Sequence, residues 1–302
     1  MERFVMARLF DPEVISRIKS YEIRARRVVQ GFLIGIHKSP TFGMSMEFKQ
    51  HREYVQGDDI RHLDWKVYAK TDKYFIKQYE SETNLACQIV LDCSESMSFK
   101  DGGPMSKFEY GATAAVSLAY LLLTQRDAVG FTFFDEKVRT YIPAQATFSQ
   151  FHAAIKVIEN ITPGAKTMTG SALMAVGNSF KRRSMVIIIS DFLDDIEPIE
   201  LGLNRLHFDG HEVLAVHISD PYEVTFPYSG PAVIEGMEAT GNLRCDPSDY
   251  RELYLERRSA HLARLRHVCR NLRFDIAEMV TTTPLDEALA ELLLLRRHTA
   301  VR

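Results

Sequence analysis

The chain has 302 residues, of which 46% are hydrophobic and 25% are charged, and its net charge is −3 at pH 7. This composition is typical of a soluble globular protein, and the charge gives no reason to expect nucleic acid as a partner. No apolar run reaches the roughly 18 residues that a membrane-spanning helix needs, and residues 1–20 lack the apolar core of a signal peptide. The four cysteines form no Cys-x-x-Cys pair, so no zinc or redox motif is indicated. We expect a cytoplasmic protein without a membrane segment.

The first 85 residues differ from the rest of the chain. A helix is expected over about residues 12–30, with Asp11 as its N-cap and Pro12 in its first turn. A polar, aromatic-rich stretch follows, in which alternating pieces such as residues 73–80 ("KYFIKQYE") favour strands separated by turns. Residues 1–85 are therefore expected to form an N-terminal helix with a short β-strand extension.

From residue 86 onward, strand-like and helical stretches alternate. Apolar runs typical of strands occur at 87–92, 128–134, 185–190, 212–218 and 272–279. Amphipathic helical stretches occur at 107–125, 148–161, 170–182, 197–208, 246–272 and 284–298. A short return after the second strand indicates one antiparallel edge. The alternation predicts that residues 86–302 form a doubly wound α/β domain, whose mostly parallel sheet is covered by helices on both faces.

Oxygen-bearing side chains stand where the predicted strands or loops end. Asp92, Ser94 and Ser96 occupy every second position directly after the first strand. Thr167 lies in a loop that enters a helix, and Asp191 follows the most apolar strand of the chain. Ligands of open α/β sheets bind beyond the carboxyl ends of the strands. If these strands are neighbours, the two carboxylates and three hydroxyls converge on one edge of the sheet.

The chemistry of these five side chains favours a hard metal ion. All the donors are oxygen atoms, a set that suits octahedral coordination of Mg²⁺, with Mn²⁺ or Ca²⁺ as alternatives, and disfavours zinc. Hydroxyl ligands are neutral and leave the ion much of its positive charge, so an open position would attract an Asp or Glu of a partner. Taken singly, the motif Asp-x-Ser-x-Ser also suits a capped loop and Thr167 an ordinary N-cap. Their combination and order indicate the metal site.

Residues 86–280 resemble a von Willebrand factor A domain, and the five side chains match its metal-ion-dependent adhesion site. The resemblance implies that the three hydroxyls contact the metal, that the two carboxylates act largely through bound water, and that a partner carboxylate takes the sixth position. One departure is the sequence Ala165-Lys166 where the family often has Gly-Gly. A lysine there would weaken metal binding by repulsion between like charges.

The N-terminal stretch carries a second resemblance. The segment "EFKQHREYVQGDDIRHLDWKVYAKTDKYFIKQYE" is similar to the signature of the bacterial domain of unknown function numbered fifty-eight. The matching residues are Phe48, Arg52, Tyr54, Gly57, Asp58, Asp59, Arg61, Asp64, Trp65 and Ala69. The resemblance implies work with a MoxR-type AAA+ ATPase in chaperone-like maturation or complex assembly. By itself, the mixture of acidic and basic residues in "GDDIRHLDW" favours a structural ion-pair network over a catalytic or docking cluster.

Three functions remain after these observations. We expect a non-enzymatic, metal-dependent protein-interaction module that binds a partner carboxylate through a magnesium site. The alternative is a Mg²⁺-dependent phosphoryl-transfer enzyme with Asp92 as nucleophile and Lys166 balancing the phosphate charge. That chemistry usually needs a second carboxylate two residues on, where this chain has Ser94. A third option is an adaptor with a vestigial metal site. No histidine pairs in sequence with an activatable Ser or Cys, and no catalytic residue is assigned.

Overall fold

The computed structural model describes residues 12–38, 51–53, 75–77, 86–180, 183–236 and 241–300. The chain forms two compact units, one of Met1–Leu33 with Leu85–Arg302 and the other of Ile34–Asn84. In the second unit, β1 (His51–Glu53) pairs antiparallel with β2 (Phe75–Lys77). The strand β2 lies within residues 73–80, which were predicted to form a strand, and β1 lies in the same stretch, where short strands separated by turns were expected without stated bounds. The "GDDIRHLDW" segment and its expected ion-pair network lie outside the described residues.

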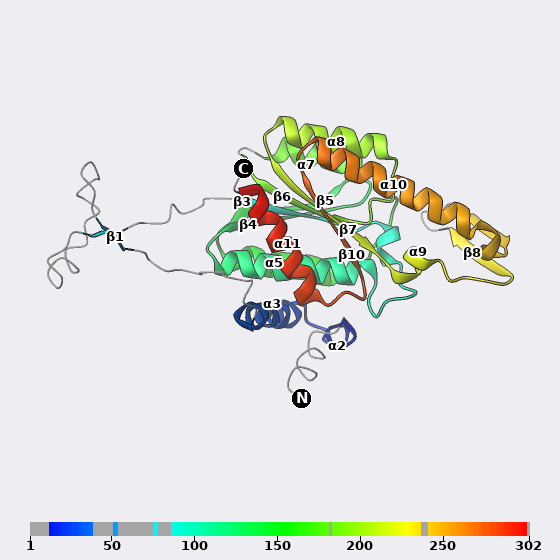
Figure 1. The fold of residues 1–302 in the computed structure, drawn as a ribbon, viewed down its shortest axis with the longest axis horizontal. Coiled ribbons are helices and arrows are strands. Elements are labelled where there is room, and N and C mark those ends of the chain that lie inside the picture. Colours follow the sequence, from blue (N-terminus) through cyan, green and yellow to red (C-terminus); the bar gives the residue numbers. More distant parts are fainter. Residues whose placement is uncertain are drawn as a thin grey trace. The chain divides into compact units, whose positions relative to one another are not determined.

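A six-stranded sheet forms the centre of the first unit (Figure 1). Its strands are β3 (Ala86–Asp92), β4 (Ala128–Phe134), β5 (Val138–Gln145), β6 (Met185–Ser190), β7 (Glu212–Ser219) and β10 (Asp275–Val280). The order in space is β10-β7-β6-β3-β4-β5, and all neighbours are parallel except the edge strand β5. This is the doubly wound order 3-2-1-4-5-6. The predicted mostly parallel sheet with one antiparallel edge is confirmed.

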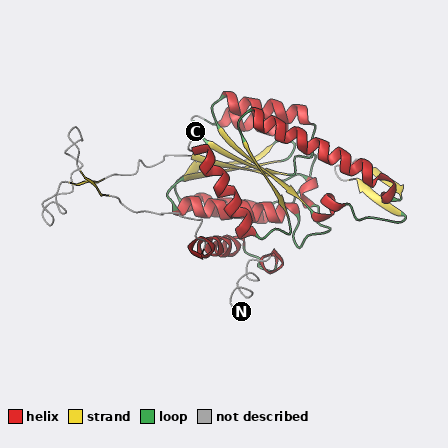
Figure 2. Cartoon of the chain, viewed as in Figure 1, coloured by secondary structure: helices red, strands yellow, loops and turns green. Residues whose placement is uncertain are grey.

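Helices cover both faces of this sheet (Figure 2). They are α5 (Lys107–Thr124), α6 (Phe148–Asn160), α7 (Thr169–Ser179), α8 (Ile196–Phe208), α10 (Arg251–Asn271) and α11 (Leu285–Ala300). The short helix α9 (Pro221–Thr225) follows the end of β7. Figure 1 shows α7, α8 and α10 on one side of the sheet, with α5 and α11 on the other. The two central strands are buried on both faces, which explains their uninterrupted apolar sequences.

The N-terminal helix differs from its prediction. Instead of one helix over 12–30, the chain forms α2 (Pro12–Ser16) and α3 (Tyr21–Lys38), while Asp11 lies outside the described residues. The guanidinium of Arg24 donates to the backbone carbonyls of Ser16 and Ile18, which lie at and just beyond the end of α2. Carbonyls at a helix end lack intrahelical partners, so these contacts stabilise the break. Arg24 also donates to Thr113 of α5, which ties this part of the expected N-terminal segment to the sheet unit.

A hairpin near the end of the chain was not predicted. β8 (Ala232–Gly236) and β9 (Gly241–Cys245) pair antiparallel, and a short 3₁₀ turn, η3 (Pro247–Tyr250), precedes α10. These strands are largely exposed and lack the apolar run that marked the sheet strands. In the part of the chain that the structure describes, no helix combines the length and the apolar character needed to cross a bilayer.

The role of Arg24 gives a first test. Arg24 is buried, and its guanidinium also lies 4.9 Å from the ring centre of Tyr21. We expect Arg24→Leu to lower the free energy of unfolding by about 2 kcal/mol, because it removes the donors of two partly buried carbonyls. Denaturant unfolding would measure the change. The exposed Arg27, on the same helix, is the control: Arg27→Leu is expected to have a much smaller effect, and equal effects would contradict the capping role of Arg24.

Candidate metal centre at the switch point of the sheet

The first and fourth strands of the domain, β3 and β6, are neighbours in the sheet. The strand order reverses between them, and ligands of doubly wound sheets bind at this switch point beyond the carboxyl ends of the strands. Asp92 is the last residue of β3, and Asp191 directly follows β6. The sheet topology therefore brings the two carboxylates to one place, as the sequence predicted.

The three hydroxyls lie at the same place. The Oγ atoms of Ser94 and Ser96 are 3.1 Å apart, and the Oγ of Ser96 lies 3.4 Å from the Oγ1 of Thr167. Adjacent ligands of an octahedral Mg²⁺ with bonds of about 2.1 Å are separated by about 3.0 Å. None of the five predicted residues is more than 5% exposed. The structure thus brings all five together, at spacings close to those of neighbouring metal ligands.

Asp92 is held by hydrogen bonds to both of its carboxylate oxygens. Its Oδ1 accepts from the backbone N–H of Ser94 at 2.9 Å, and its Oδ2 accepts from the hydroxyl of Ser190 at 2.6 Å. Burial, with the nearby negative charge of Asp191, raises the pKa of Asp92 to about 7. The carboxylate is fixed but electrostatically unfavourable, a condition that a bound cation would relieve.

Backbone hydrogen bonds join the loop after β3 to the loop that carries Thr167. The N–H of Glu95 donates to the carbonyl of Ala165 at 3.0 Å, and the N–H of Gly164 donates to the carbonyl of Cys93 at 3.1 Å. Ala165 has a φ of 66°, in the left-handed region that favours glycine. Ala165, which stands where the family often has glycine, is therefore at a strained position. The hydrogen bonds between the two loops are formed despite this strain.

A buried lysine that the sequence analysis missed lies next to the site. The Nζ of Lys107, at the start of α5, is 2.6 Å from Asp191 Oδ2 and 2.6 Å from Glu223 Oε1, and its side chain is 0% exposed. Burial by itself lowers the pKa of Lys107, but the two carboxylates outweigh it and hold that pKa above its ordinary value. The same pairing outweighs burial at Asp191 and keeps its pKa below the usual range.

Lys166, which the sequence analysis placed beside the metal, is exposed. The cation within the site is instead Lys107, which enters from α5. Nearly every residue of that helix is buried, including its first one, Lys107. A lone cation in so apolar a helix signals a buried ion pair, and this signal was present in the sequence. Its partners were not, because Glu223 lies 116 residues further on.

Glu223 is positioned by the short helix α9. Its Oε2 accepts from the backbone N–H of Asp220 in a capping box, which leaves Oε1 for Lys107. The carboxylate of Asp220 in turn accepts from the backbone N–H groups of Asp101, Gly102 and Gly103. The loop before α5, the helix α9 and the candidate metal centre thus form one connected polar network.

The charges of Lys107 and the three carboxylates nearest to the candidate metal centre do not balance. Fully ionised Asp92, Asp191 and Glu223 carry three negative charges, and Lys107 supplies one positive charge, which leaves −2 in a buried place. Buried charge is costly unless it is paired. Among the described residues no three His, Cys, Asp or Glu side chains group as a metal site, so an ion here would need the Ser and Thr hydroxyls. The charge and the oxygen donors fit a hard divalent cation.

The arrangement does not favour the phosphoryl-transfer alternative. A nucleophilic carboxylate must be reached by its substrate, but Asp92 is 0% exposed and both of its oxygens already accept hydrogen bonds. The position two residues on is the buried hydroxyl of Ser94, and Lys166 is exposed.

The strand order, the antiparallel edge and the Asp-x-Ser-x-Ser turn after the first strand define a von Willebrand factor A-like fold. The family described as "Protein of unknown function DUF58" matches residues 50–264, and the chain belongs to this family. Uncharacterized proteins of Mycobacterium bovis and Mycobacterium tuberculosis are 27% identical over 235 residues, which cover 76% of this chain and 72% of theirs.

Several solved structures are similar to this chain. The conserved hypothetical protein BatB from Bacteroides thetaiotaomicron has a TM-score of 0.49 at 15% identity, covering 70% of this chain and 99% of that one. An aerotolerance-related membrane protein from Bacteroides fragilis has a TM-score of 0.48 at 18% identity, with coverages of 70% and 99%. The VWA domain of SpRpn10 has a TM-score of 0.43 at 11% identity, with coverages of 68% and 93%. The fold assignment stands on the sheet order given above.

The buried ion pairs of Lys107 make a second prediction. Lys107→Met leaves Asp191 and Glu223 buried without a counter-charge, and we expect it to lower the free energy of unfolding by about 3–5 kcal/mol. Lys156→Met, at an exposed lysine of α6, is the control and is expected to change little. Adding Glu223→Gln to Lys107→Met should recover part of the loss. Additive losses in denaturant unfolding would contradict a coupled pair.

The strained loop makes a third prediction. Ala165→Gly removes the steric cost of a left-handed residue, and we expect it to raise the free energy of unfolding by about 1 kcal/mol. The exposed Ala175 in α7 is a matched control, because Ala175→Gly in an ordinary helix should lower that free energy by about 1 kcal/mol. Thermal or denaturant unfolding of both variants measures the change in the free energy of unfolding and its sign. A lower free energy of unfolding in both variants would contradict backbone strain at Ala165.

Proposed function

We propose that this protein is a non-enzymatic interaction module whose switch-point site binds Mg²⁺ and, through the ion, a carboxylate of a partner protein. The observation that carries the proposal is the buried group of three neighbouring hydroxyls and two carboxylates. Its excess negative charge calls for a divalent cation, and its donors are the oxygens that Mg²⁺ prefers. Mn²⁺ or Ca²⁺ would be weaker alternatives.

Each residue of the site has a distinct role in this proposal. Ser94, Ser96 and Thr167 would contact the ion, and these neutral ligands would leave it able to attract an anion. The carboxylates would act on the ion largely through water. They already orient the serines, because Ser94 forms hydrogen bonds to Asp92 and the side chain of Ser96 forms one to Asp191. Lys107 offsets the negative charge of Asp191, and this pairing disfavours Asp191 as a direct ligand of the ion. The ion would therefore keep more of its positive charge.

The surface around the site supports a protein as the ligand. Met168, next to Thr167, is 43% exposed, and Leu193, two residues after Asp191, is 52% exposed. Exposed apolar side chains beside a buried charged centre are typical of interfaces in which a central polar contact is shielded from water. A partner's Asp or Glu at the ion would place its flanking residues against these two side chains.

The partner we propose is a MoxR-type AAA+ ATPase, with which the protein would act in chaperone-like maturation or complex assembly. The support for this partner is the family to which the chain belongs. The cytoplasmic location expected from the sequence also stays a prediction. Fractionation of cells and co-purification with and without Mg²⁺ would test both points, and loss of the ATPase in EDTA is the expected result.

Calorimetry with Mg²⁺ and Mn²⁺ tests the metal site directly. We expect saturable binding to the wild type and a loss of about tenfold or more in Ser94→Ala, because one of a few ligands is removed. Ser98→Ala is the matched control, since Ser98 lies in the same turn, is exposed, and its hydroxyl donates to the carbonyl of Glu95. Should the wild type bind neither ion, even with the ATPase present, a working metal site is excluded.

Stability without and with the ion gives an independent test. In EDTA, Asp92→Asn should be more stable than the wild type, because it removes a buried negative charge. Burial raises the pKa of Asp92 from 3.8 to about 7, so the charged form is penalised in the folded state. The advantage of Asn therefore grows from about pH 4 to pH 7 and is constant above that. Saturating Mg²⁺ should reverse the order at pH 8; an unchanged order would count against the ion's contact with this carboxylate.

A further inference from the structure

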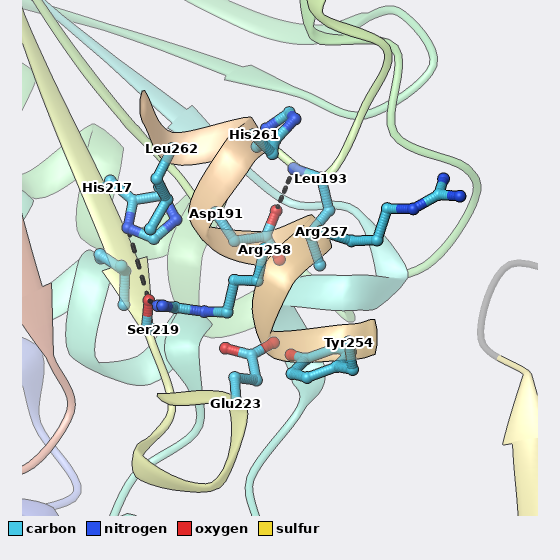
Figure 3. A pocket seen from close by; sticks show the side chains of 11 residues that line it. Asp191, Leu193, His217, Ser219, Glu223, Tyr254, Arg257, Arg258, His261 and Leu262 are labelled. Carbon is cyan, nitrogen blue, oxygen red and sulfur yellow. Dashed lines mark hydrogen bonds between the residues drawn. The ribbon is translucent and has the colours of Figure 1, made fainter. Parts of the chain in front are cut away.

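A pocket of about 240 Å³ opens beside Asp191, between the end of β7, the helix α9 and the first half of α10 (Figure 3). Its walls are mainly apolar and come from Leu193, Ile218, Leu262 and the ring of Tyr254. The volume is below the 300–1,000 Å³ typical of drug-sized ligand sites, so the pocket suits a small molecule or a single side chain. None of the functions described above uses it.

The guanidinium of Arg258 crosses this pocket. Its Nη2 donates to the hydroxyl of Ser219 at 2.8 Å, and Figure 3 shows the side chain reaching toward that residue while Arg257 points outward. Among the described residues no carboxylate forms an ion pair with Arg258; the charge of Glu278, which pairs directly with Arg266, acts on Arg258 from a greater distance. A guanidinium has five N–H donors, and a half-buried one without an anion is energetically incomplete.

The other ionisable groups of the pocket do not supply that anion. Asp191 and Glu223 line the wall, but both bind Lys107. Burial lowers the pKa of His217 to about 4, so this imidazole is neutral at pH 7, and the Nε2 of His261 contacts the carbonyl of Phe192.

Arg258 is the cation that these groups leave without an ion pair. Asp191 and Glu223 share the ammonium group of Lys107, and Arg257 is exposed and points away from the pocket. The guanidinium of Arg258 lies next to walls that would shield a ligand from water, where a pairing of unlike charges is strengthened.

We propose that the pocket binds a carboxylate on a short aliphatic stem, of the kind that a glutamate side chain offers. Arg258 is its counter-ion, with donors left for a paired contact to both carboxylate oxygens, and the apolar walls enclose the stem. The pocket's preference for a carboxylate does not depend on the proposed function. The further step, that this carboxylate belongs to the partner that docks at the metal, rests on the proposed function. Because Asp191 borders both places, such a partner would present two acidic residues close together.

The probe is glutarate, with glutaramide as its uncharged analogue. In protein labelled at its methyl groups, glutarate should shift the resonances of Ile218, Leu193 and Leu262 in a saturable way at millimolar concentration, and glutaramide should not. Arg258→Gln should weaken this binding by about tenfold or more, and Arg258→Lys by less, because it keeps the charge but loses the forked donors. Arg264→Gln, at an exposed arginine of α10 paired with Glu197, should leave it unchanged.

Three results would overturn the proposal: no saturable shift at tens of millimolar glutarate, equal shifts with glutaramide, or unchanged binding in both Arg258 variants. A global loss of structure in Arg258→Gln leaves the lysine variant to decide. Repeating the titration in EDTA and with Ser94→Ala separates the two sites, since glutarate should still bind when the metal site cannot. Binding lost in both conditions would instead place glutarate at the metal centre.

Discussion

A buried excess of negative charge at the carboxyl edge of the sheet is the constraint on which the rest of the site depends. The doubly wound topology makes β3 and β6 neighbours, and this brings Asp92 and Asp191 to a place where neither is solvated. The surrounding groups reduce the cost in different ways. Asp92 accepts hydrogen bonds at both oxygens, whereas Asp191 forms an ion pair with Lys107 of α5. Neither the hydrogen bonds nor the ion pair removes the whole negative charge, and in our proposal the remaining negative charge gives the site its affinity for a cation.

Lys107 extends this constraint beyond the metal centre. Because Lys107 binds both Asp191 and Glu223, it links the short helix α9 to the residue that follows β6. Asp220, at the start of α9, accepts hydrogen bonds from the backbone of residues 101–103. The wall of the neighbouring pocket is therefore built partly from the same ion pairs. A change in charge at Asp191 would be felt at Glu223 through a single ammonium group, which is a short and specific route between the two proposed binding places.

The features predicted from the sequence are those written in local patterns. Strands buried on both faces are visible as apolar runs, and the strand-end rule located the four oxygen-bearing residues at the ends of β3 and β6 without knowledge of the strand order. Thr167 was found instead from its place in a loop that enters a helix. The features missed depend on contacts between distant residues. Arg24 bonds back to the end of α2 and across to α5, and Lys107 meets partners 84 and 116 residues away. Periodicity carries no information about such pairs. The exposed hairpin β8–β9 was missed for another reason, since its strands have no apolar face to the core.

The same burial that argues against catalysis by Asp92 supports recognition. A nucleophile has to be exposed to its substrate, and a carboxylate enclosed by Ser94 and Ser190 is not. As an outer partner of a metal ion, however, an enclosed carboxylate is useful, because it orients the hydroxyl ligands and does not neutralise the ion by direct contact. Lys107 acts in the same direction at Asp191. A cation held in this way keeps most of its charge for a visiting anion, and the exposed Met168 and Leu193 offer the apolar surround that a partner protein's carboxylate would need.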